Sequence, residues 1–200
     1  MLEQLKTVLE NKGYTVRLFQ TAQQAREYVL ASVSPEQSVG IGGSISVQQL
    51  ELDKELAAKG CPVYWHWTAP GPEKEAAQVS AATADVYLCS ANAVTVKGQL
   101  INIDGHGNRV AATIHGPGKV IFLIGRNKIV EDYDAAMDRI KNTACPANAR
   151  RLGLQTPCAA LGYCTDCSSP QRMCNATVIL ERATSGHPME VVLVDEDLGY

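Results

Sequence analysis

The sequence lacks the features that mark several protein classes. No apolar run approaches the roughly 18 residues that a membrane-spanning helix needs, and the first residues do not combine a basic flank with an apolar stretch, as a secretory signal does. Lysine and arginine nowhere form a run, and 18 basic against 21 acidic side chains leave a net charge of −3. This balance argues against nucleic acid or an anionic membrane surface as the main partner. We therefore expect a cytoplasmic protein without a membrane span.

Signs of disorder and of repeat architecture are also missing. Only 20% of the residues are charged and 46% are hydrophobic, a composition that is too apolar for a disordered chain. A chain of 200 residues can bury roughly 70% of the surface that its unfolded form exposes. Because the sequence contains no internal repeat and no low-complexity segment, we expect a single domain over residues 1–200 with one core.

Helix-like and strand-like segments alternate along most of the chain. Such alternation predicts an α/β fold, with a mostly parallel sheet covered by helices on both faces in three layers. Ligands of these folds bind beyond the carboxyl ends of the strands, so the loops after Ile41, Cys89 and Gly125 are expected to lie together. A hairpin is predicted at Lys97-Gly98, and 176–182 with 190–194 are predicted as paired edge strands. The predicted helices include 21–31, 47–59, 73–84, 108–115 and 133–143, and the predicted strands include 14–19, 38–41, 62–67, 85–89 and 119–125.

Cysteine is the one residue type present in unusual number. Disulfide frameworks are rare in a reducing compartment, and seven cysteines cannot all pair, so metal binding or thiol chemistry becomes the leading interpretation. Four of the seven lie within one loop-like stretch of 17 residues, in which we expect neither helix nor strand: Cys158, Cys164, Cys167 and Cys174.

These four cysteines form the pattern C-x5-C-x2-C-x6-C. Short, unequal spacings on a looping segment suit the four corners of a [4Fe–4S] cluster, which is our favoured interpretation of residues 158–174. A structural Cys₄ zinc site is the alternative, although such sites more often use two C-x2-C pairs and only Cys164 and Cys167 form one here. Cys145 precedes a proline and is left open as a replacement ligand or a buried thiol.

A glycine-rich turn follows the predicted strand at 38–41 and precedes a helix. In this context the backbone N–H groups of Gly42, Gly43 and Ser44 are candidates for holding a phosphate or a carboxylate. The turn lacks the third glycine of a dinucleotide fingerprint, and no acid follows at the ribose-binding distance. A tight turn without a ligand remains the alternative.

A second polar strip lies between apolar strands. Asp104 or His106 is a candidate acid or base and Arg109 a candidate carboxylate clamp, but turns built on Asx side chains explain the same residues. We expect the strip to border a ligand pocket. Its polar members are Asn92, Asn102, Asp104, His106, Asn108 and Arg109.

Taken together, these segments resemble the lactate-utilisation (LUD) domain family. The matching pieces are GIGGS at 40–44, SANAVT at 90–95, the stretch from GQLINIDGHGNRV to GRNKIV at 98–130, and the cysteine segment with its CN at 174–175. The resemblance implies a fold similar to NagB/RpiA/CoA-transferase-like proteins, with the glycine turn and the strip at 92–109 bordering the ligand cleft. In this sequence we find no glutamate placed like the nucleophile of CoA transferases.

The resemblance also implies a role in the oxidation or utilisation of lactate or a related small hydroxy acid. In this interpretation the protein is an iron–sulfur component that transfers electrons or binds substrate, with a small anionic metabolite as ligand and redox subunits as partners. The alternative is a non-redox binding or regulatory subunit with a structural zinc site. Both alternatives are compatible with a homo-oligomer.

Overall fold

The computed structural model describes all 200 residues and is organised around a six-stranded sheet. Its order is β1-β10-β7-β4-β2-β3, and every neighbouring pair is parallel. The predicted α/β class with a mostly parallel sheet is therefore confirmed. The strands are β1 (Thr15–Phe19), β10 (Met189–Val194), β7 (Lys119–Gly125), β4 (Val86–Cys89), β2 (Val39–Ile41) and β3 (Val63–Trp65).

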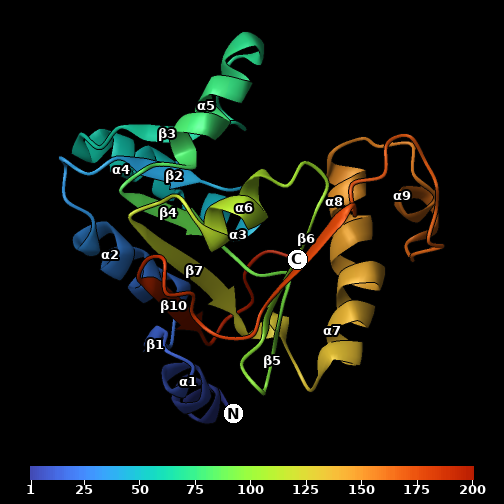
Figure 1. Cartoon of the computed structure of the whole chain (residues 1–200), viewed down its shortest axis with the longest axis horizontal. Helices are drawn as coiled ribbons and strands as arrows, with labels where there is room; N and C mark the ends of the chain where they lie inside the picture. The colour runs from blue at the N-terminus through green and yellow to red at the C-terminus, as the bar shows by residue number, and fades with distance from the viewer.

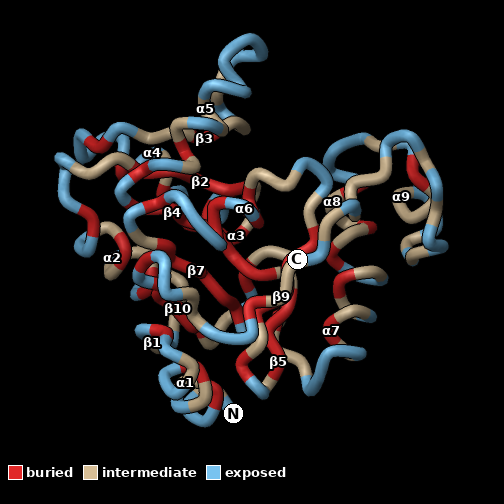
Figure 2. The backbone as a smooth tube through the Cα atoms, in the orientation of Figure 1, coloured by how far each residue is buried: buried red, intermediate tan, exposed pale blue.

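The two faces of this sheet carry separate apolar clusters. Along β7, Val120, Phe122 and Ile124 belong to one cluster, whereas Ile121 and Leu123 belong to the other, as the two-residue period of a strand requires. One face packs against α2 (Ala22–Ser32), α3 (Ile45–Gln49) and α4 (Leu52–Lys59), and the other against α1 (Leu2–Asn11), α5 (Lys74–Ala81), α6 (Asn108–Ile114) and a second sheet. Figure 2 shows the buried residues concentrated on the central strands.

The second sheet was not predicted, although its hairpin was. It has the order β8-β5-β6-β9, formed by β8 (Ile129–Val130), β5 (Ala93–Thr95), β6 (Leu100–Asp104) and β9 (Ala176–Leu180). β5 and β6 are antiparallel and join through the predicted turn at Lys97-Gly98, where Gly98 has φ +77°. One face of this sheet packs on the main core, and the other packs on α7 (Tyr133–Arg139), as Figure 1 shows.

The predicted pairing of 176–182 with 190–194 is wrong. β9 pairs with β6 in the second sheet, while β10 lies in the main sheet between β1 and β7. All six residues of β10 are buried, a pattern typical of a central parallel strand, whereas β9 keeps only its last residue fully buried. β9 and β10, which follow one another in the sequence, therefore belong to different sheets.

Two predicted helices and one stretch predicted to be irregular also differ from the structure. The helix expected at 47–59 is divided into α3 and α4 at Glu51, whose φ is +49°. The helix expected at 133–143 continues through wider π-type turns at Ile140–Ala144 into α8 (Cys145–Arg151), so that Pro146 lies directly after the π-type turns. The cysteine stretch, expected to be irregular, includes the short helix α9 (Pro157–Leu161). None of the helices has the length and apolar character to cross a membrane.

Candidate functional site

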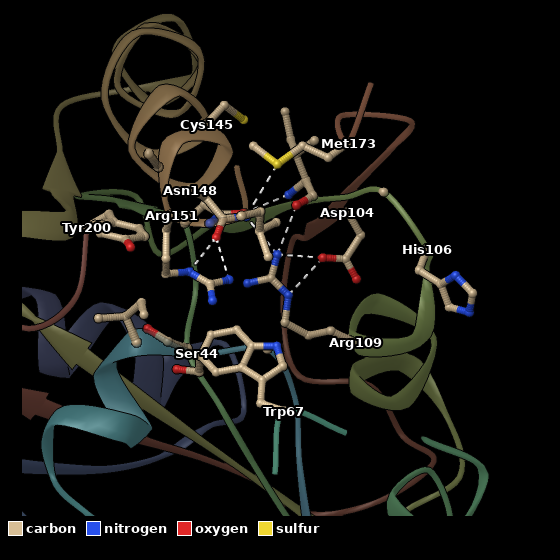
Figure 3. A pocket seen from close by; sticks show the side chains of 18 of the residues that line it. Ser44, Trp67, Asp104, His106, Arg109, Cys145, Asn148, Arg151, Met173 and Tyr200 are labelled. Atoms are coloured by element: carbon tan, nitrogen blue, oxygen red, sulfur yellow. Dashed lines mark hydrogen bonds and ion pairs between the residues drawn. The ribbon is translucent and has the colours of Figure 1, made fainter. Parts of the chain in front are cut away.

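A cavity of about 590 Å³ lies beyond the carboxyl ends of the parallel strands. Gly43 and Ser44 after β2, Ser90 to Asn92 after β4, and Lys128 after β7 all line it. The predicted meeting of the three loops is therefore confirmed. The opposite wall comes from β6 and its following turn, from α8, and from Met173 at the end of the cysteine segment (Figure 3).

Six of the seven predicted ligand-binding residues line this cavity: Gly43, Ser44, Asn92, Asp104, Asn108 and Arg109. Gly42 does not line the cavity and lies instead against Tyr87 and Arg109. A Cβ atom at Gly42 would stand 2.9 Å from the Tyr87 hydroxyl and 3.1 Å from Cγ of Arg109. Glycine at this position therefore makes room for the Arg109 side chain and contributes to the site indirectly.

Arg109 is the centre of a buried polar network. Its Nε and Nη2 donate to Oδ1 of Asp104 at 2.9 and 2.6 Å, and Nη2 also donates to Asn92 Oδ1 at 3.1 Å and to the Ile103 carbonyl at 2.9 Å. Oδ2 of Asp104 accepts from the Val110 amide at 3.1 Å. Asp104 and Asn92 therefore build a scaffold that positions an arginine whose Nη1 has no hydrogen-bond partner within the chain. The role of Arg109 as a carboxylate clamp stays a prediction.

Lys128 is a site residue that the sequence analysis missed. Its side chain is buried, and Nζ donates to Oγ of Ser46 at 2.9 Å and to Oγ of Ser90 at 2.8 Å, with no carboxylate in contact. Burial lowers the pKa of Lys128 to about 7, and the nearby charges of Arg139 and Arg109 act in the same direction. Ser46, Ser90 and Lys128 follow three neighbouring strands, which is the only sequence signal that links them.

The rim of the cavity adds more positive charge. The Arg151 guanidinium lies 4.1 Å from the ring centre of Trp67, and its Nε and Nη2 donate to Asn148 Oδ1 at 3.1 and 2.8 Å. Among the lining residues, Lys74, Arg109, Lys128 and Arg151 face a single acid, Asp104, which is already paired with Arg109. The site is therefore suited to an anionic ligand.

The cysteine segment borders this cavity. Cys158 lies on α9, and Cys164, Cys167 and Cys174 lie on the following loop; all four are free thiols of intermediate exposure. Cys145 begins α8 and lines the cavity, and burial followed by the influence of Cys174, Cys158 and Cys164 raises its pKa to about 12. No three cysteine, histidine, aspartate or glutamate side chains meet in an arrangement that would hold a metal ion. The metal site at 158–174 stays a prediction.

Hydrogen bonds fix the segment to the body of the domain. The Cys164 amide donates to Asn142 Oδ1 at 3.0 Å, and the Asn175 amide donates to the Asp104 carbonyl at 2.9 Å. Arg172 donates to the carbonyls of Cys167 and Cys174 at 2.6 and 3.2 Å. These hydrogen bonds therefore fix the backbone that carries the four thiols to the body of the domain.

Comparison with known families agrees with this architecture. The family model of the LUD domain matches residues 2–194. The chain belongs to the LUD domain family. This confirms the resemblance drawn from the motifs.

The LUD domain is also similar to a solved structure, the crystal structure of a DUF162 family protein from Deinococcus radiodurans. The TM-score is 0.56 at 14% identity, and the match covers 96% of this chain and 95% of that one. At this identity the likeness concerns the fold alone. No curated protein matches the chain.

The LUD domain cavity contains further residues that sequence reasoning missed. Besides Lys128, these are Trp67, Lys74, Ser90, Asn148, Arg151 and Tyr200. Ser90 lies in the SANAVT motif without being singled out, and the others are ordinary surface-type or loop residues that no local pattern distinguishes. Only the packing of β3, α5 and α8 around the strand ends brings these residues together.

Proposed function

We propose that this LUD domain binds a small anionic metabolite of the hydroxy-acid type, such as lactate, and serves in its oxidation or utilisation. The observation that carries the proposal is the charge of the cavity, in which Lys74, Arg109 and Arg151 stand against one acid that is already paired, with the amine of Lys128 as a further basic group. A volume of about 590 Å³ lies within the usual range of small-molecule sites.

The arrangement offers separate partners for the two ends of such a ligand. Arg109 Nη1 has no partner within the chain, and Arg151 lies at the rim, so both are available for a carboxylate. Asn108 lines the same cavity, and its side-chain amide is available to donate a hydrogen bond to a hydroxyl oxygen. A hydroxy acid needs this combination of charged and neutral partners.

Arg151→Gln tests the charge argument without disturbing the buried network. Arg151 is exposed and pairs with no acid, so its loss leaves no unpaired carboxylate. Removing one charge-assisted contact is expected to weaken lactate binding about tenfold or more. Titration calorimetry with L-lactate measures the effect, and Arg182→Gln is the matched control at an exposed position outside the cavity. Equal affinity of both variants and the wild type would argue against the proposal.

We further propose that Cys158, Cys164, Cys167 and Cys174 hold a [4Fe–4S] cluster. The support is chemical: four unpaired thiols lie on one short segment, and hydrogen bonds fix its backbone to the body of the domain. A cluster bound there would supply one-electron transfer. The residues of the chain would supply the thiolates, and Arg172 would offset part of their negative charge.

Metal analysis of anaerobically purified protein tests this assignment. About four irons per chain and a broad absorbance near 400 nm are expected for a [4Fe–4S] centre, and Cys167→Ser should lose most of the iron. Cys61→Ser is the control, since Cys61 is a buried core thiol whose only hydrogen-bond partner is the Ser34 carbonyl.

A structural zinc site is the alternative, favoured by the hydrogen bonds that tie the segment to Asn142 and Asp104. One zinc and no iron would support it and would leave a non-redox binding subunit. Protein that carries neither metal, with unchanged stability in Cys167→Ser, would overturn both assignments.

A further inference from the structure

The amine nitrogen of Lys128 has one position for a hydrogen-bond or bonding partner that no group of the chain fills. Two positions are used by its hydrogen bonds to Oγ of Ser46 and Ser90. Both hydroxyls have other acceptors for their own protons: Ser90 Oγ donates to the Leu123 carbonyl at 2.6 Å, and Ser46 Oγ lies 3.3 Å from the Leu198 carbonyl. Both serine oxygens therefore accept from Nζ, which leaves a third position on the nitrogen without a partner in the chain. Lys128 also lines the cavity, where a ligand can take this position.

The surroundings of this amine favour its neutral form. No carboxylate contacts Nζ, while the guanidinium groups of Arg109 and Arg139 are close enough to oppose a further positive charge. The chain segment after β10 covers the amine from another side, because a Cβ at Gly199 would stand 3.1 Å from Nζ and 2.7 Å from Ser46 Oγ. A desolvated lysine beside other cations is the usual state of an amine nucleophile.

We propose that Lys128 forms an imine with the carbonyl carbon of a 2-oxo acid bound in the cavity. The inference rests on the proposed function, because a 2-oxo acid is the oxidised counterpart of a 2-hydroxy acid and carries the same carboxylate. Nζ attacks the carbonyl carbon and forms a carbinolamine. The C–O bond then breaks, and the oxygen leaves as water with the two hydrogens of the amine. No electrons are exchanged in this step.

The other cavity residues fit the demands of that reaction. The free Nη1 of Arg109 is available for the carboxylate, and Arg109 is itself fixed by Asp104 and Asn92. Ser90 contacts Nζ directly and also lines the cavity, so its hydroxyl lies beside the carbon–nitrogen bond as it forms. The site thus combines an anion clamp with a neutral amine, which distinguishes 2-oxo acids from simple carboxylates.

Reductive trapping tests the imine. The full-length protein is incubated with pyruvate and sodium borohydride, and the expected result is one adduct per chain, with a mass increase equal to pyruvic acid less one oxygen atom. Peptide mapping should place the adduct on Lys128. Absence of an adduct, or an adduct that maps to other lysines, would overturn the inference.

Two lysine variants sharpen the result. Lys128→Met removes the amine at nearly constant length and should lose the adduct, whereas Lys97→Met removes an exposed lysine outside the cavity and should keep it. If Lys128→Met does not fold, the mapped position in the wild type still decides. Calorimetry with pyruvate separates the two proposals: binding without trapping overturns only the imine, while absence of binding and trapping overturns the proposed function as well.

Discussion

Replacing Arg109 by methionine is expected to abolish anion binding and to lower the free energy of unfolding by about 3–5 kcal/mol, because it strands a buried carboxylate. The Asp104 side chain is 12% exposed, and its Oδ1 receives two hydrogen bonds from Arg109. Urea unfolding and titration calorimetry with L-lactate measure the two effects. The same substitution removes the free Nη1 that we assign to the ligand.

The double variant Arg109→Met/Asp104→Asn separates stability from binding. Asparagine at 104 removes the unpaired charge, and its side-chain oxygen can still accept from the Val110 amide. We therefore expect a large part of the lost stability to return while binding stays absent. A double variant that binds L-lactate like the wild type would show that Arg109 has only a structural role.

The second large effect is a pH dependence of stability that originates in Lys128. Its pKa is lowered by burial to about 7 in the folded protein, against 10.5 as the ordinary value. Between these values the unfolded chain binds more protons than the folded one, so raising the pH stabilises the protein through this window. Below pH 7 the destabilising contribution is fully present, and above pH 10.5 it is gone.

Lys128→Met isolates this contribution from all other titrations. At and below pH 7 the variant lacks the penalty of burying a cation, so its stability relative to the wild type should be greatest there and should fall by about 3 kcal/mol between pH 7 and pH 10. Urea unfolding of both proteins at the two pH values measures the change. Parallel pH profiles of the variant and the wild type would contradict a lowered pKa at this lysine.

Local patterns predicted individual elements better than their partners. The uniformly apolar run at Lys119–Gly125 became β7 with the expected bounds, and Lys97-Gly98 became the expected hairpin turn. The partners of β9 and β10 were missed because both runs are rich in valine and isoleucine, and β-propensity does not specify which strand lies alongside. Glu51 ended a predicted helix through a left-handed backbone conformation that helix propensity does not reveal.

At the site, too, local patterns indicated single residues better than the contacts between distant ones. Asn92, Asp104 and Arg109 were found because polar residues gathered between apolar strands stand out in the sequence, and the structure does join them in one network. Lys128 was missed because a lone lysine after a strand is typical of a solvent-exposed loop. Its burial depends on Ser46 and Ser90, which lie 82 and 38 residues away in sequence.

The place of β10 in the main sheet has a consequence for how the chain assembles. β1 has β10 as its only neighbour, and their registered residues, such as Val16 and Val191, are separated by almost the whole sequence. During synthesis the α1-β1-α2 unit must therefore wait, with its strand edges unpaired, until the last strand has left the ribosome. Such long-range closure slows folding and exposes the nascent chain to aggregation. We therefore expect chaperones that bind emerging polypeptides to matter most for this protein until β10, which begins at Met189, has left the ribosome.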